Sequence, residues 1–200
     1  MKTRSPLHRL LALALLLFAG HAAADDAAAR AVVEHLHEAL LGAMQSGGTA
    51  EARRTALAPV IEQSFDFDTI CRIFTGRYWK DTSDEQRARF VDTFKRLSIA
   101  TYAANFKSYA GERFETVGAE ADKDSLIVRT TLHTGDGDEV SLNYLLRQNN
   151  DTWRIINVVA QGVSDLSLKR ADYTAVIKAE GIDSLVNRLE KKIAETGREP

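Results

Sequence analysis

The 200-residue chain contains a single cysteine, so no disulfide can form within it in any redox compartment. Cys71 stands among apolar neighbours with no histidine near it in the sequence, which favours a buried, inert thiol over a nucleophile. Zinc and phosphate-loop signatures are absent, and the acidic turn at 136–138 is too short for a calcium loop. The sequence therefore predicts no bound metal or cofactor.

Excess positive charge is also absent. The formal charge of the whole chain is −2, and residues 25–200 alone carry 23 Lys and Arg against 28 Asp and Glu, a charge of −5. A nucleic-acid partner is therefore not expected. The same sign disfavours lasting adsorption to anionic lipid headgroups.

The N-terminus has an apolar run, but that run is too short to span a membrane. Lys2, Arg4 and Arg9 precede the unbroken apolar residues 10–18, and alanines at 22–24 are small enough for signal peptidase. A membrane span needs about 20 apolar residues, roughly twice this run. We therefore predict a signal peptide over 1–24 and export to the periplasm. The predicted domain is 25–196, followed by a disordered tail at 197–200.

The first half of the predicted domain has helical periodicity. Apolar residues recur at helical spacing from 27 to 44, and the glycines at 47–48 are expected to end this helix. Thr49 can cap a second helix that runs to about Gln63.

Two further helix starts are predicted from local signals. Asp66 is the expected N-cap of a short helix, with Phe65 and Ile70 placed as a hydrophobic staple. A capping box over Thr82–Glu85 is expected to begin a long helix that ends near Gly111.

The second half changes to the two-residue period of strands. Four strands are expected at 114–121, 125–134, 139–148 and 152–159, followed by helices at 165–177 and 183–195. Short turns between the strands predict an antiparallel meander with one strongly apolar face. The predicted fold class is α+β, with a helical lobe packed on a curved antiparallel four-stranded sheet in a single domain.

Two segments far apart in the chain carry a resemblance to a known family. FDFDTICRIFTGRYW at 65–79 and WRIINVVAQGVS at 153–164 resemble the two most recognisable stretches of the MlaC family, the periplasmic lipid-binding proteins also called the toluene-tolerance family. The similarity extends over roughly residues 32–192. It implies an NTF2-like sheet with a helical lobe laid on it, and a pocket between them that holds the acyl chains of a lipid.

One segment departs from the typical family pattern. SDLSLKRADY at 164–173 replaces an Asn-Tyr-Arg run and resembles the HpnM-like branch, which is associated with hopanoid-producing bacteria. The resemblance therefore implies either a hopanoid or a phospholipid as the lipid ligand. It also implies a monomer that exchanges cargo with membrane-bound transporter complexes of the ABC/MCE type or the RND type, at the inner and outer membranes.

The free energy needed to extract a lipid from a membrane indicates which residues could line a pocket. Extracting an acyl chain from a bilayer forfeits about 0.8 kcal/mol per methylene, so only a nearly complete apolar enclosure can compensate. The candidates on the sheet are Leu126, Val128, Leu142, Tyr144, Leu146 and Ile155, and those on the helices are Phe74, Tyr78, Phe90, Phe94, Leu97, Tyr102 and Phe106. The same side chains would serve equally well as a packed core. Basic candidates for a phosphate are Arg77, Lys80 and Lys107.

Two other classes of function remain open. NTF2-like folds often hold dehydratases and isomerases, which need an acid–base pair inside the cavity. None of His35, His37 and His133 adjoins a carboxylate in a way that suggests a catalytic dyad, and all three are expected on the solvated surface, so no enzyme is predicted. The other class is an envelope adaptor protein that carries no cargo.

Overall fold

A computed structural model describes the backbone of residues 6–196 and the side chains of residues 25–196. The predicted tail at 197–200 lies outside the described residues, as do the side chains of the predicted signal peptide at 1–24. Both therefore stay predictions. Within the part of the chain that is described, no helix has the length and apolar character needed to cross a membrane.

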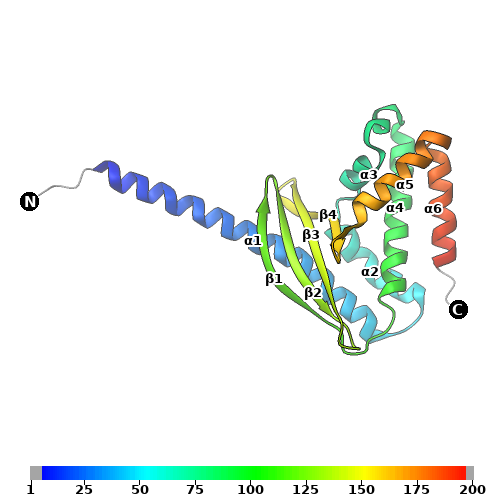
Figure 1. The fold of residues 1–200 in the computed structure, drawn as a ribbon, viewed down its shortest axis with the longest axis horizontal. Coiled ribbons are helices and arrows are strands. Elements are labelled where there is room, and N and C mark those ends of the chain that lie inside the picture. Colours follow the sequence, from blue (N-terminus) through cyan, green and yellow to red (C-terminus); the bar gives the residue numbers. More distant parts are fainter. Residues whose placement is uncertain (1–5, 197–200) are drawn as a thin grey trace, which may run out of the picture.

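The chain order is helices, then a sheet, then helices (Figure 1). The first group is α1 (Pro6–Ser46), α2 (Ala50–Ser64), α3 (Phe67–Thr75), the 3₁₀ helix η1 (Gly76–Asp81) and α4 (Asp84–Asn105). The strands are β1 (Arg113–Asp122), β2 (Ser125–His133), β3 (Glu139–Asn149), β4 (Thr152–Ala160) and β5 (Val163–Ser164). The last helices are α5 (Asp165–Glu180) and α6 (Ile182–Thr196). The predicted α+β class is confirmed.

The sheet has five antiparallel strands in the order β1-β2-β3-β4-β5, and the prediction of four strands was wrong by one. The missed strand, β5, is only two residues long and pairs with Val159 and Ala160. Gln161 and Gly162 both have positive φ angles and form the tight turn before it. Two residues are too short to show a two-residue period, so this strand left no signal in the sequence.

Two bulges bend the sheet. The β1–β2 register shifts between Thr116 and Gly118, and the β3–β4 register shifts opposite Ile156. An extra residue on one strand increases the local twist and bends that strand. The curved sheet that results has one face available for the helices to cover.

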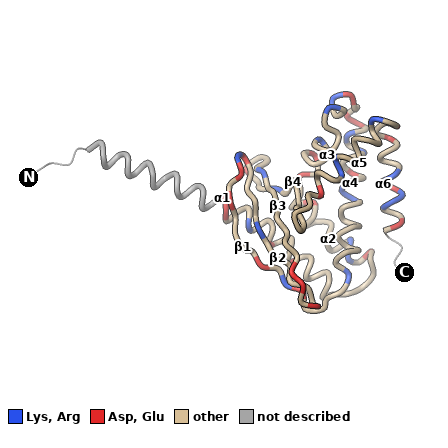
Figure 2. The backbone as a smooth tube through the Cα atoms, viewed as in Figure 1, with Lys and Arg blue, Asp and Glu red and all other residues tan. Residues whose placement is uncertain are grey.

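The helices cover only part of that face. Helix α1 contacts β1, β2 and β4, while α2, α3 and α5 contact β4. Helix α4 packs against α2, α3 and α6 and contacts the sheet far less, so these helices form a lobe that joins the sheet mainly along β4 (Figure 1 and Figure 2).

The capping box of α4 lies one residue later than predicted. The Ser83 hydroxyl accepts a hydrogen bond from the Gln86 backbone amide, and the Gln86 side chain accepts one from the Ser83 amide, both at 3.2 Å. Thr82 instead donates its hydroxyl to the Tyr78 carbonyl. The helix also ends at Asn105 rather than near Gly111, because residues 107–110 are exposed and have no apolar face to pack.

The predicted cap of α3 is confirmed and has a second role. One carboxylate oxygen of Asp66 accepts from the Thr69 amide at 2.9 Å, and the other accepts from the Asn149 side chain at 3.0 Å. The Asp66 amide also donates to the Ile155 carbonyl of β4 at 3.0 Å. This residue therefore both starts α3 and attaches the helical lobe to the sheet.

We expect Asp66→Ala to lower the free energy of unfolding by about 2 kcal/mol, because a cap and a buried interelement hydrogen bond are both lost. Asp68→Ala is the matched control, since Asp68 is exposed in the first turn of the same helix. Its expected loss is at most about 0.5 kcal/mol. Urea denaturation of both variants measures the difference, and equal losses would contradict the role given to Asp66.

Candidate functional site

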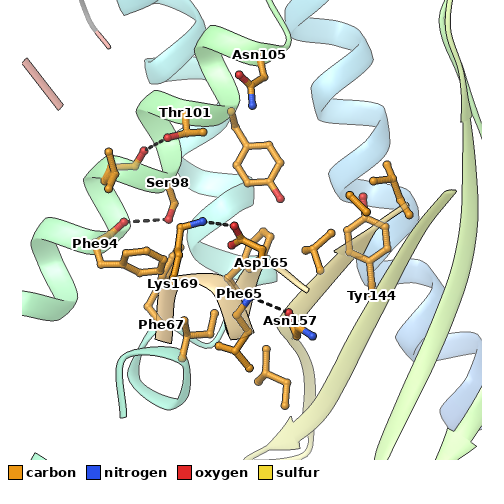
Figure 3. A pocket seen from close by; sticks show the side chains of 18 of the residues that line it. Phe65, Phe67, Phe94, Ser98, Thr101, Asn105, Tyr144, Asn157, Asp165 and Lys169 are labelled. Carbon is orange, nitrogen blue, oxygen red and sulfur yellow. Dashed lines mark hydrogen bonds and ion pairs between the residues drawn. The ribbon is translucent and has the colours of Figure 1, made fainter. Parts of the chain in front are cut away.

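A cavity of about 560 Å³ lies between the helical lobe and the uncovered part of the sheet (Figure 3). Its walls come from α3, α4, β2, β3, β4 and the start of α5, with further contributions from α6. The apolar lining residues are Phe65, Phe67, Ile70, Phe74, Phe94, Leu97, Ala104, Phe106, Leu132, Val140, Leu142, Ile156, Val158, Ala160 and Leu166, together with the rings of Tyr102 and Tyr144.

Seven of the predicted pocket residues lie in this wall: Phe74, Phe94, Leu97, Tyr102, Phe106, Leu142 and Tyr144. Five others do not line the cavity and are buried in the packed core: Phe90, Leu126, Val128, Leu146 and Ile155. The four sheet residues among these five lie toward the end of the sheet where Leu126 pairs with Leu146. Tyr78 lies in η1, where Arg77 donates to its hydroxyl at 3.1 Å.

Several lining residues were missed by the sequence reasoning. Leu132 and Val140 continue the alternation that begins at Leu126, and they are register partners at the far end of β2 and β3. Extending the apolar face to the strand ends would have found both. Phe65 was predicted as a hydrophobic-staple residue and Phe67 only as part of a family motif, so neither was a pocket candidate. Leu166 enters the wall because α5 turns back over β4.

The basic residues proposed for a phosphate do not line the cavity. Arg77, Lys80 and Lys107 are all exposed elsewhere, and the cationic residues in the wall are instead Lys169 and Lys192. Neither belongs to a motif that would have drawn attention to it.

Polar side chains of α4 do not make its cavity face polar. The Ser98 hydroxyl donates to the Phe94 carbonyl at 2.9 Å, and the Thr101 hydroxyl donates to the Leu97 carbonyl at 2.8 Å (Figure 3). Because both hydroxyl protons are used within the helix, they cost little when an apolar molecule lies against them.

Asp165 and Asn157 organise the start of α5 at the cavity. Asp165 forms an ion pair with Lys169 one turn along the helix (Figure 3). The Asn157 side-chain oxygen accepts from the Ser164 hydroxyl and the Leu166 amide, each at 3.2 Å. These contacts fix the helix start against β4.

The two cavity tyrosines are neutral. Burial raises the pKa of Tyr102, and the negative charge of Asp165 raises it further. Burial also raises the pKa of Tyr144 well above its usual value. Their hydroxyl groups are therefore protonated at physiological pH and present hydrogen-bonding groups in a largely apolar wall.

His37 is buried, and the prediction of a solvated side chain was wrong for this histidine. Only 4% of its surface is exposed. Its Nε2 atom lies 2.9 Å from the Tyr144 hydroxyl oxygen, and its ring stacks on Phe114 with centroids 3.9 Å apart. His35 points to the other side of α1 and is exposed as expected. The partners of His37 come from the sheet, far away in the sequence.

His133 lies beside two exposed carboxylates from the neighbouring strands. Its Nε2 lies 3.0 Å from Glu115 and its Nδ1 lies 3.3 Å from Glu139, which join β1, β2 and β3 at one end of the sheet. The hydrogen bond from His133 is the largest cause of a lowered pKa at Glu115, and Arg113 adds to it. This cluster is outside the cavity wall.

Burial makes His37 a source of acid sensitivity. Desolvation lowers its pKa from 6.5 to about 4, so the unfolded chain binds a proton in this range that the folded chain does not. Stability should therefore fall as the pH drops from about 6.5 toward 4, by up to about 3 kcal/mol.

Thermal or urea unfolding between pH 7.5 and 4.5 tests this prediction. His37→Gln should flatten the pH dependence in that window, whereas His35→Gln, two residues away and exposed, should leave it unchanged. If both variants keep the acid sensitivity of the parent protein, its source is not His37.

Among the side chains of residues 25–196, no group of three or more His, Cys, Asp or Glu residues is placed to hold a metal ion. Cys71 is buried as predicted, and burial raises the pKa of its thiol well above the usual value, with Asp68 adding to the effect. The thiol therefore stays protonated.

An apolar cavity at a helix–sheet interface, with few polar groups in its wall, is typical of proteins that bind an apolar small molecule. The chain belongs to the MlaC family: the model of that family, described as MlaC protein, matches residues 30–191.

The chain is similar to several known proteins, among them two curated relatives and one solved structure. It is 25% identical over 125 residues to the intermembrane phospholipid transport system binding protein MlaC of Haemophilus influenzae, which is 60% of this chain and 58% of that protein. It is 26% identical over 135 residues to the toluene tolerance protein ttg2D of Pseudomonas putida, which is 66% of this chain and 61% of that protein. The chain thus spans about three fifths of each relative.

The solved structure is the phospholipid-binding protein from Ralstonia solanacearum in complex with a phospholipid. The two folds superpose with a TM-score of 0.75 at 23% sequence identity, covering 85% of this chain and 99% of the other. This likeness establishes that the chain has the fold of that phospholipid-binding protein.

Proposed function

We propose that this protein is a periplasmic lipid carrier that encloses the apolar part of one lipid and moves it between membrane complexes. The observation that carries the proposal is the apolar cavity of about 560 Å³ at the helix–sheet interface. A packed core leaves few voids larger than a water molecule, so an apolar space of this size supports a binding site for a ligand.

The similar proteins also support a lipid carrier. The Haemophilus relative is named for intermembrane phospholipid transport, and the Ralstonia structure contains a phospholipid. We therefore propose a phospholipid or a hopanoid as the cargo. The HpnM-like sequence at 164–173 is the sole support for a hopanoid cargo, and assignment of the chain to that branch stays a prediction.

The proposed partners are membrane-bound transporter complexes of the ABC/MCE or RND type, which the protein visits as a monomer. A carrier needs no reaction of its own, and we propose that the chain is not an enzyme. The buried His37 is neutral and hydrogen-bonded to Tyr144, and none of the described carboxylates forms an ion pair with it.

A vesicle-extraction experiment tests the carrier function. The protein is incubated with vesicles of phosphatidylethanolamine and phosphatidylglycerol that contain a hopanoid, and the vesicles are then removed by sedimentation. The proposal predicts lipid in the supernatant at up to one molecule per chain, and its delivery to fresh acceptor vesicles. A supernatant free of lipid would contradict it.

A further inference from the structure

The start of α5 separates the cavity from solvent. Asp165, Leu166 and Lys169 line the cavity, while Leu168, on the same turns of the helix, is 57% exposed. Figure 1 shows α5 leaving the sheet beside β5 and crossing onto the lobe, and Figure 3 shows Asp165 and Lys169 at the cavity. One side of this segment therefore faces the cavity and another faces solvent, so displacing the segment would open the cavity.

The second half of α5 is anchored to the lobe. Tyr173 and Ile177 are the buried residues of this helix, which the structure describes along its whole length. The Tyr173 ring meets Phe74 edge-to-face with centroids 5.2 Å apart, and it also contacts two aromatic rings of α4. The Thr174 hydroxyl donates to the Phe74 carbonyl at 2.9 Å. Detaching this half would expose buried apolar surface, which opposes its movement.

The first half of α5 has few attachments to the sheet. None of the described residues from 165 to 172 is buried, although Leu166 is half-buried. The Asn157 side-chain oxygen accepts from the Ser164 hydroxyl and the Leu166 amide, and no other described side chain of the sheet hydrogen-bonds to this half. The ion pair of Asp165 with Lys169 lies within the helix and does not connect it to the sheet.

The chain just before α5 is also weakly attached. Strand β5 pairs with β4 through Val163 and Ser164 alone. Gly162 precedes this strand with a φ of 79°, which glycine adopts without strain, and apart from its chain neighbours no described atom lies within 4 Å of the place that a Cβ would take. Segments with few buried apolar contacts open locally at a free energy far below that of global unfolding. The junction of β5 and α5 has this character.

These contacts point to a moving part of the cavity wall. We propose that the gate segment, residues 163–172, swings away from β4 to let the lipid enter and leave, while the second half of α5 stays on the lobe. Asn157 is the latch, meaning the side chain that holds the gate segment closed. The inference rests on the proposed carrier function and adds the route of lipid exchange, without choosing between a phospholipid and a hopanoid.

A disulfide that joins β5 to β4 tests the gate. Val159 and Ser164 are register partners of an antiparallel pair, in which Cα atoms lie about 4.5–5.5 Å apart, a separation that a disulfide bridges. Val159→Cys/Ser164→Cys would therefore fix the free end of the gate segment, since Tyr173 already anchors the helix beyond it. Cys71 is buried and does not compete for the new thiols.

The full-length variant is loaded in its reduced form from vesicles of phosphatidylethanolamine and phosphatidylglycerol that contain diplopterol. It is then oxidised, and release of lipid to acceptor vesicles is followed by mass spectrometry. The expected result is release at least tenfold slower than from the reduced form, with recovery on adding a reductant. The matched control is Asp122→Cys/Ser125→Cys, a register pair of β1 and β2 outside the cavity wall, whose oxidation should leave release unchanged.

Hydrogen exchange tests the latch separately. Asn157→Ala should speed exchange of the amides at 168–172 about tenfold, the effect of losing two hydrogen bonds, and leave exchange in the second half of α5 unchanged. Asn143→Ala is the matched control, because Asn143 is half-buried on β3 and lies outside the cavity wall. It should not alter exchange at 168–172.

The possible failures are distinguishable. Equal release from the oxidised and reduced gate variant, or equal slowing by the control disulfide, would overturn the gate and leave the carrier function standing. Equal exchange at 168–172 in the two asparagine variants would overturn the role given to Asn157. If the parent protein takes up no lipid from the vesicles, the carrier function is wrong and the gate with it.

Discussion

Leu142→Asp should reduce lipid affinity at least a hundredfold while the protein stays folded. Leu142 is half-buried on β3 and lines the cavity, so the new carboxylate would lie against the acyl chain. Burying a charge beside hydrocarbon without a partner costs several kcal/mol, and about 2.7 kcal/mol already corresponds to a hundredfold loss of affinity. Titration with a lipid probe measures the change, and circular dichroism checks the fold.

Val117→Asp is the control, because it introduces the same carboxylate on the sheet outside the cavity. Val117 lies at the β1 bulge, is 64% exposed and is outside the cavity wall. It should bind lipid like the parent protein. If Leu142→Asp also retains full affinity, the cavity described above is not the binding site. Phe94→Asp is a poorer test, because Phe94 is 4% exposed and packs against three aromatic rings.

Arg53→Met should lower the free energy of unfolding by about 3–5 kcal/mol, the loss of two hydrogen bonds from a buried charged group. Arg53 is only 3% exposed. Its Nε donates to the Ala103 carbonyl at 2.8 Å, and its Nη1 donates to the Gly48 carbonyl at 2.7 Å. The first bond holds the end of α4, and with it one wall of the cavity, against α2, and the second joins α2 to the loop that precedes it.

The neighbouring arginine provides the contrast. The Nε and Nη2 atoms of Arg54 are buried and have no hydrogen-bond partner among the described residues. Arg54→Met should therefore be neutral or slightly stabilising, since unsatisfied buried donors are removed. Urea denaturation curves of both variants compare them directly. A loss at Arg54 as large as that at Arg53 would contradict this account of the α2–α4 contact.

Local signals were predicted well because their partners are near in the sequence. The caps at Thr49 and Asp66 each accept from an amide three residues later, which a short motif specifies completely. The error of one residue at the α4 box shows the limit of the method. Thr82 and Ser83 have the same capping chemistry, and only the bond of Thr82 to Tyr78 decides between them.

The cavity could be predicted only as a set of alternatives. Val128 and Leu142 belong to the same apolar face and have the same pattern in the sequence, yet one is core and the other lines the cavity. What separates them is which part of the sheet α1 and the lobe cover, and that is set by contacts between distant elements. His37 was misplaced for the same reason, since Tyr144 is 107 residues away.

The central claim is that the space between lobe and sheet holds a lipid. Native mass spectrometry of the protein as it leaves the cell measures this most directly. The account predicts a species heavier than the polypeptide by one lipid molecule, which is lost in Leu142→Asp. A bare polypeptide mass that persists after incubation with membrane lipids would contradict it.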